Sequence, residues 1–160
     1  MLKPYTINKS HEDFSIRLTK WCLVLLAVCA IVMLLSGPRI VGIMMLRTSP
    51  WLQGALRYYL LLGSGYVLGT LALIVIVQLF HLVDRIGRGE VFIATNVRSL
   101  QLIGWSVGVV AIMALIISIT CYLPVLAIAI AGAFMTLIIR VVRNAFGKAV
   151  QMQDELDYTI

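Results

Sequence analysis

The longest uncharged stretch of the chain is residues 99–139, SLQLIGWSVGVVAIMALIISITCYLPVLAIAIAGAFMTLII. It places 41 residues between Arg98 and Arg140, whereas a helix needs only about 20 apolar residues to cross a bilayer. The stretch is therefore long enough to cross twice. Pro124 disfavours helix at the residue before it and marks the turn. We predict a third span over residues 100–121 and a fourth over residues 124–142, joined by a tight hairpin.

Two shorter uncharged runs lie upstream, at residues 21–38 and 58–83. A charged side chain at the bilayer centre costs about 2.5 to 3.5 kcal/mol, so spans lie between charges, and we expect a first span over 19–37 and a second over 58–80. Only 12% of the 160 residues are charged and 61% are apolar, which excludes an ordinary soluble domain. The prediction is an all-α integral membrane four-helix bundle, with residues 1–160 as a single transmembrane domain.

The basic residues predict the orientation of these spans. Four crossings put both ends of the chain and the middle loop on one side, with ten Lys and Arg: Lys3, Lys9, Arg17, Lys20, Arg85, Arg88, Arg98, Arg140, Arg143 and Lys148. The other side has three: Arg39, Arg47 and Arg57. Because cytoplasmic loops carry the excess of Lys and Arg, we expect both termini in the cytoplasm. The net charge of +6 then reflects topology, and we expect no direct binding of nucleic acid.

Segments outside the spans have predicted structure of their own. Ser10 and Asp13 form a capping box, which predicts a helix from about residue 11 into the first span. Residues 39–57 are expected to lie on the outer membrane surface. In the middle loop, residues 85–89 break the helix, and residues 90–97 are expected to form a short interfacial helix on the cytoplasmic side.

The tail, residues 143–160, is expected to continue the fourth span as a helix that protrudes into the cytoplasm. Apolar residues recur on one helical face, at Val142, Ala145, Phe146, Ala149, Met152 and Leu156, and need a cover. A helix over residues 125–156 is about 48 Å long, against roughly 30 Å of hydrocarbon. The acidic end of the tail is either solvated or a contact, for a basic partner or for the arginines of the middle loop.

No motif in the sequence indicates a catalytic site or a metal site. Cys22, Cys29 and Cys121 lie in apolar stretches and are expected to be reduced, buried side chains. His81 and Asp84 are one helical turn apart, but two ligands do not make a metal site. We expect no enzyme activity, no cofactor and no metal. The spans also lack the ionisable residue that coupled transporters hold at mid-membrane depth, and their Ser, Thr and Gln residues are expected to join helices.

Glycine pairs at a spacing of four residues predict close helix packing. Gly65 and Gly69 form one pair in the second span, and Gly104 and Gly108 form another in the third. Small residues at this spacing let two helices approach closely in a membrane. The pairs are expected either to pack the bundle internally or to form the seam of a homodimer.

Two short motifs resemble a known family. They are Gly89-Glu90-Val91-Phe92 followed by Asn96-Val97-Arg98 and Leu100, and the ending Ala149-Val150 with Asp154-Glu155-Leu156-Asp157-Tyr158-Thr159-Ile160. Over residues 15–160 the chain resembles the DUF2975 family of small bacterial membrane proteins, which look like four-span proteins with a G-x-x-F-x-x-x-N loop. The ending departs from the family pattern, because Leu156 stands at an Asn position and Tyr158 at a Leu position.

This resemblance implies a multi-pass protein of the bacterial inner membrane with no established activity. Its genes often neighbour a small helix-turn-helix regulator, which implies a cytoplasmic partner of that kind. The implied contact surface is Glu90, Phe92, Asn96, Asp154, Glu155 and Asp157. The first hypothesis is a non-enzymatic membrane sensor or regulatory partner of such a protein. The alternative is a small transporter, a transporter subunit or a peptide-immunity protein.

Overall fold

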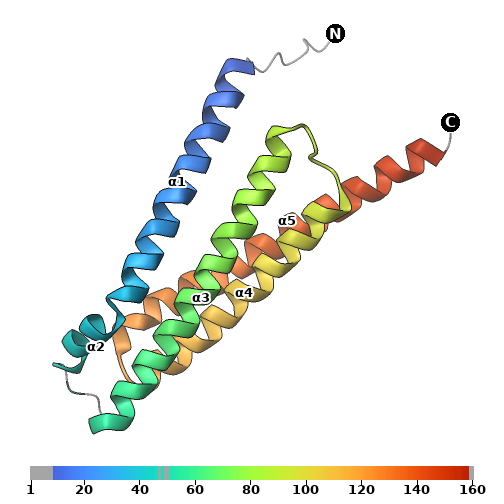
Figure 1. Cartoon of the computed structure of the whole chain (residues 1–160). Helices are drawn as coiled ribbons and strands as arrows, with labels where there is room; N and C mark the ends of the chain where they lie inside the picture. Colours follow the sequence, from blue (N-terminus) through green and yellow to red (C-terminus); the bar gives the residue numbers. More distant parts are fainter. Residues whose placement is uncertain (1–8, 47, 49–50, 159–160) are drawn as a thin grey trace.

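A computed structural model describes residues 9–46, 48 and 51–158 of the chain, with the side chains of residues 9–13, 154, 157 and 158 left aside. The described part is all-α (Figure 1). The elements are α1 (Lys9–Leu35), α2 (Gly37–Met45), α3 (Gly54–Gly87), α4 (Ala94–Thr120), the short 3₁₀ helix η1 (Leu123–Val125) and α5 (Leu126–Tyr158). Four segments are long and apolar enough to cross a membrane: Phe14–Leu35, Gly54–Gly87, Ala94–Thr120 and Leu123–Gln153.

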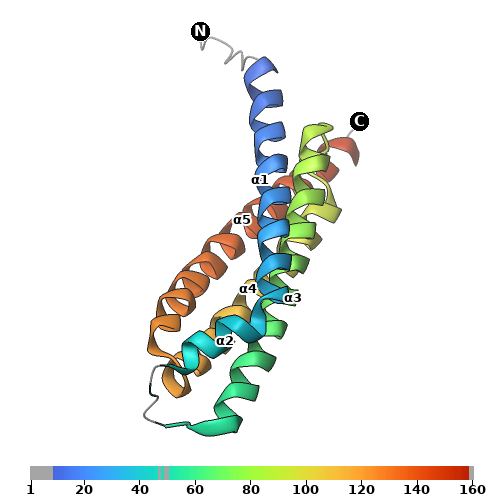
Figure 2. The same cartoon turned by 60° about the vertical axis from the view of Figure 1, so that its left-hand side comes forward.

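Two prolines set the breaks between helices. The predicted turn at Pro124 is confirmed, because α4 ends at Thr120 and Pro124 lies in η1, just before α5. Pro38 also acts as a break, since it has no N–H to continue the hydrogen bonds of α1. It then lies in the first turn of α2, where a missing N–H does no harm. Residues 39–45, predicted as part of a loop, are therefore helical, and α2 turns sharply away from α1 (Figure 2).

Different segments of the chain lie at the two ends of the helices. The start of α1, the α3–α4 loop (residues 88–93) and the end of α5 lie at the same end of the helices, and we call this the α3–α4 end (Figure 1). At the other end, α2 packs against α3, and we call this the α2 end. A small core of Val41, Leu61 and Cys121 lies there. Lys9 and Ser10 are already helical, whereas the sequence predicts a helix from about residue 11, and the side chain of Ser10 lies outside the described part.

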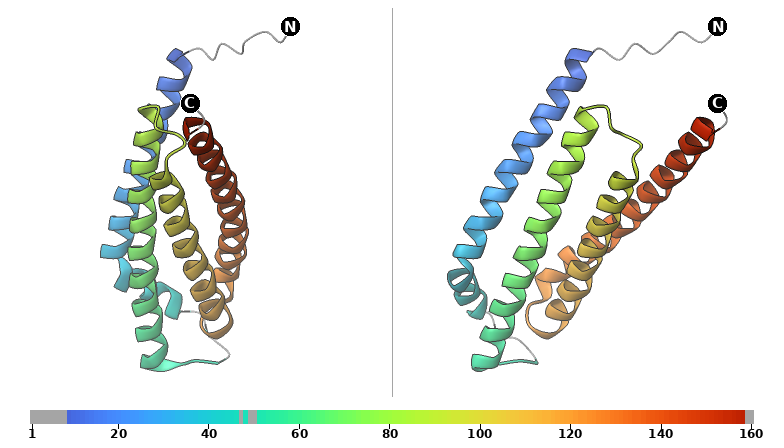
Figure 3. Two further views of the ribbon diagram at one scale, coloured as in Figure 1. Left: turned by 90° about the vertical axis from the view of Figure 1, so that its right-hand side faces the viewer. Right: turned by 45° about the vertical axis from the view of Figure 1, so that its right-hand side comes forward.

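The four long helices form an open row in the order α1, α3, α4, α5 (Figure 3). In the part of the chain that the structure describes, α1 contacts α2 and α3 but neither α4 nor α5. The all-α fold and the four candidate spans of the predicted four-helix bundle are confirmed, and the helices are arranged as an open row. Apolar helix faces gain little by closing on one another in a membrane, because lipid tails cover them equally well. Cys22 and Cys29 are accordingly exposed on α1, whereas Cys121 is buried as predicted.

Small residues occupy the tightest helix contacts. A Cβ added at Gly69 would overlap Cδ2 of Leu34, so α1 and α3 approach closely there. Gly104 and Gly108 face α5, with Ile139 and Thr136 at 3.2 and 3.6 Å from the added Cβ. Gly132 of α5, which the spacing argument missed, faces Ala111 of α4.

Gly65 is the exception among the four predicted packing glycines. A Cβ at this position would meet nothing within 4 Å, so Gly65 does not form the internal contact predicted for it. The four-residue spacing identifies one face of α3, which α1 approaches closely at Gly69 and again at Gly87, against Ile16, but not at Gly65. The difference makes Gly65 a natural control for Gly69.

We predict that Gly69→Val destabilises the protein by about 1–3 kcal/mol, because the added methyl groups overlap Leu34 and force α1 away. The matched variant Gly65→Val places the same side chain in open space and should change stability by less than about 0.5 kcal/mol. Unfolding free energies in detergent would measure both. Equal losses in the two variants would contradict the contact between α1 and α3.

Candidate functional site

The α3–α4 loop has a defined backbone path. Gly89 has a φ of +84°, a left-handed conformation that favours glycine. The N–H of Gly89 donates to the carbonyl of Ile86 at 3.0 Å, and that of Glu90 donates to the carbonyl of Arg85 at 3.1 Å. The loop is thus folded back on the last turn of α3 by its own backbone.

Asn96 closes the loop from the α4 side. Its side chain is fully buried, and Nδ2 donates to the carbonyls of Glu90 at 2.8 Å and Val91 at 2.9 Å. A side chain, rather than the amides of a following helical turn, therefore satisfies these two carbonyls. This corrects the predicted interfacial helix over residues 90–97, since α4 begins only at Ala94.

Arg85 ties the end of α3 to the same amide. Its Nη1 donates to Oδ1 of Asn96 at 3.1 Å and to Oγ of Ser99 at 3.2 Å. Ser99 is buried one turn into α4, so the bonds reach across the gap between the two helices. Arg85, Asn96 and Ser99 together form what we call the loop latch.

Phe92 joins the loop to α5. Its ring centroid lies 5.6 Å from that of Phe146, within the range of a favourable aromatic contact. Phe146 belongs to the apolar face that the sequence analysis expects to be covered. The α3–α4 loop supplies part of that cover, and α5 is held against the loop about three turns before the helix ends.

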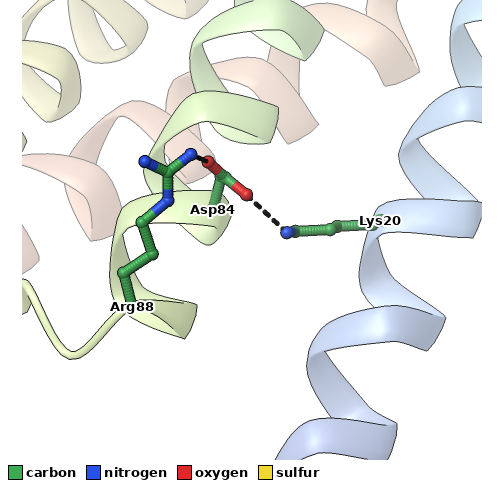
Figure 4. Close-up of polar contacts among 3 residues, drawn as sticks. All are labelled: Lys20, Asp84 and Arg88. Atoms are coloured by element: carbon green, nitrogen blue, oxygen red, sulfur yellow. Dashed lines mark hydrogen bonds and ion pairs between the residues drawn. The ribbon is translucent and has the colours of Figure 1, made fainter.

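A second polar cluster lies beside the latch and connects α1 to α3. Nζ of Lys20 lies 2.6 Å from Oδ1 of Asp84, and Arg88 donates to Oδ2 of the same carboxylate (Figure 4). Nζ of Lys20 also lies 5.9 Å from the ring centroid of Phe80, at the outer limit of a cation–π contact. Asp84 is therefore an anchor between two cations rather than a partner of His81, which is exposed and lies against Phe80.

The residues predicted as a partner contact occupy different environments. Glu90 is exposed, Phe92 is half-exposed and Glu155 is exposed near the end of α5. Asn96 is inaccessible, so it holds the loop instead of touching a partner. The side chains of Asp154 and Asp157 lie outside the described part. Over the described residues, no group of three or more His, Cys, Asp or Glu side chains is arranged to hold a metal ion.

Arg57 has a structural role that the sequence analysis missed, where it was only one of the three basic residues counted on the outer side of the membrane. Its side chain is 3% exposed at the α2 end. Nη2 donates to the carbonyl of Cys121 at 2.9 Å and approaches that of Met44 at 3.5 Å. Cys121 is the C-cap of α4, where carbonyls point outward without helical partners and the helix dipole favours a cation. No spacing in the sequence indicates this burial, because it depends on contacts of the start of α3 with distant segments of the chain.

We predict that Asn96→Ala loosens the α3–α4 loop. Two part-buried carbonyls lose their donor and Arg85 loses one acceptor, at a cost of about 1–3 kcal/mol. Hydrogen exchange of the amides of residues 89–91 should then accelerate by roughly tenfold or more. Thr95→Ala, which changes an exposed side chain one residue away, should leave exchange unchanged. Exchange that is equally slow in both variants would rule out the latch.

Comparisons with known proteins relate this loop to a family. A family model described as "Protein of unknown function (DUF2975)" matches residues 47–160, which include α3, α4 and α5 but neither α1 nor α2. The match is shorter than the resemblance over residues 15–160 expected from the sequence. Searches of curated proteins and of solved structures found no match. The matched region covers most of the chain and contains both motifs, and the chain therefore belongs to the DUF2975 family.

Proposed function

We propose that this protein is a non-enzymatic, multi-pass protein of the bacterial inner membrane that presents a docking surface to a cytoplasmic regulator. The surface consists of the exposed part of the α3–α4 loop and the last turns of α5. Its orientation toward the cytoplasm rests on the excess of Lys and Arg at the α3–α4 end. A small helix-turn-helix protein is the partner that the family resemblance favours.

The observation that carries the proposal is the exposed end of α5. This helix has 33 residues and is about 50 Å long, so about 20 Å extends beyond the hydrocarbon. Met152 and Leu156 are 62% and 67% exposed there. They lie four residues apart on one face, with Glu155 beside them. An apolar pair with an acidic neighbour, outside the membrane, fits a partner groove that has an apolar floor and a basic rim.

The loop contact supports the same proposal. Phe92 against Phe146 fixes the direction in which α5 leaves the membrane, and the loop latch fixes Phe92. A partner bound to the end of α5 would therefore meet Glu90 of the loop in a defined position. Movement of α3 against α4 would change the positions of the loop and of α5, and so alter the surface that the partner binds.

The hydroxyl groups inside the spans favour this role over transport. Ser64 and Thr70 donate to the carbonyls of Leu60 and Tyr66, and Thr136 donates to that of Gly132. Each bond stays within its own helix, three or four residues back, instead of joining helices as the sequence analysis expects. Bonds of this kind leave little polar surface to line a path for a hydrophilic substrate.

We expect the full-length protein in lipid nanodiscs to bind a small helix-turn-helix regulator of the kind that the family resemblance implies. The double variant Met152→Ser/Leu156→Ser should weaken binding by about tenfold or more, because two apolar side chains lose most of their burial energy. Fluorescence anisotropy of the labelled regulator would measure the Kd.

The matched control is Gln151→Ser/Gln153→Ser, which alters exposed polar residues on the same turns of α5. It should bind as the unmodified protein does. Absence of binding by the unmodified protein, or equal Kd values for the two double variants, would overturn the proposal.

A further inference from the structure

A groove runs between α4 and α5. Its volume is about 490 Å³. Gly104 and Gly108 lie in its wall, and neither contributes a side chain to it. Val109 and Ile112 continue the wall with exposed apolar side chains.

The groove has an apolar end and a basic end. Gly104 faces Ile139 and Gly108 faces Thr136, so α4 and α5 run antiparallel along it. In this register Gln101 of α4 lies level with Arg140 and Arg143 of α5, and all three line the groove. From Gln101 to Ile112 the groove is about 16 Å long, close to the depth of one hydrocarbon leaflet.

Among the described side chains, no carboxylate forms an ion pair with Arg140 or Arg143. Nε and Nη2 of Arg143 donate to Oδ1 of Asn144 at 3.3 and 2.9 Å. Arg140 is exposed and Arg143 half-buried. Both stand at the end of the apolar part of α5, where arginine side chains extend to the level of lipid headgroups. Trp105 lies beside them with its ring exposed, as tryptophan does at a membrane interface.

We propose that this groove binds an anionic phospholipid. The lipid phosphate would lie on the guanidinium groups of Arg140 and Arg143, with one acyl chain along Gly104, Gly108 and Ile112. The charge of the arginines selects an anion, and the apolar floor, as long as a leaflet is deep, selects an acyl chain attached to it. This inference concerns the membrane-embedded face and does not rest on the proposed regulatory partner.

Trp105 provides a direct probe of occupancy. The chain has three tryptophans, so the variant Trp21→Phe/Trp51→Phe keeps Trp105 as its one tryptophan. We would reconstitute this full-length protein into phosphatidylcholine vesicles that contain brominated phosphatidylglycerol or brominated phosphatidylcholine, and measure quenching of Trp105. The quenching curves give the relative binding constant of the two lipids beside the groove. We expect phosphatidylglycerol to bind at least about fivefold more strongly.

Charge variants test the assignment to these two arginines. Arg140→Gln/Arg143→Gln should reduce the preference for phosphatidylglycerol to about one, and Arg140→Lys/Arg143→Lys should keep a preference because the charge remains. Arg98→Gln is the matched control, since Arg98 is exposed near the start of α4 but does not line the groove. If the double Gln variant does not enter the membrane, each single Gln variant should still lower the preference by several-fold.

Three results would overturn the inference. Equal quenching by the two brominated lipids would show that the groove does not select a charged headgroup. An equal loss of preference in Arg98→Gln would show a general surface-charge effect. Loss of the preference on addition of excess inorganic phosphate would show a simple anion site rather than a lipid site.

Discussion

The exclusion of charge and of unpaired backbone groups from hydrocarbon is the constraint on which the rest of this structure depends. Within a bilayer, backbone N–H and C=O groups must bond inside a helix, and charged residues must stand at the helix ends. Four long apolar helices follow from this constraint. Contacts between them come from small residues, because apolar side chains pack against lipid as readily as against each other. Gly69, Gly104 and Gly132 accordingly lie at the closest approaches.

Polar interactions concentrate at the two ends of the row of helices. At the α2 end, Arg57 bonds to the carbonyl at the C-terminus of α4. At the α3–α4 end, Lys20 and Arg88 hold Asp84, and Arg85 and Asn96 hold the loop. These bonds give each residue of the G-x-x-F-x-x-x-N motif a physical role. Gly89 supplies the positive φ, Phe92 packs on α5, and Asn96 replaces missing backbone donors.

Sequence reasoning predicted what depends on local chemistry. The uncharged run of residues 99–139 and Pro124 were enough to predict two helices and their turn, and the length of α5 followed from its apolar face. Features that depend on contacts between distant residues were missed. The helix over residues 90–97 was wrong because the amide of Asn96 bonds the loop carbonyls. Neither the open row of helices nor the burial of Arg57 can be predicted from the spacing of residues along the sequence. Both depend on how far one helix lies from another.

The central claim is that the chain crosses the membrane four times, with the α3–α4 loop and the end of α5 in the cytoplasm. Single cysteines at Thr48, Glu90 and Glu155, in a protein whose three native cysteines are replaced by alanine, would test it in spheroplasts with a membrane-impermeant maleimide. The account predicts labelling at position 48 in intact spheroplasts, and at positions 90 and 155 only after permeabilisation. Labelling of positions 90 and 155 from opposite sides, or of position 48 from the same side as position 155, would contradict it.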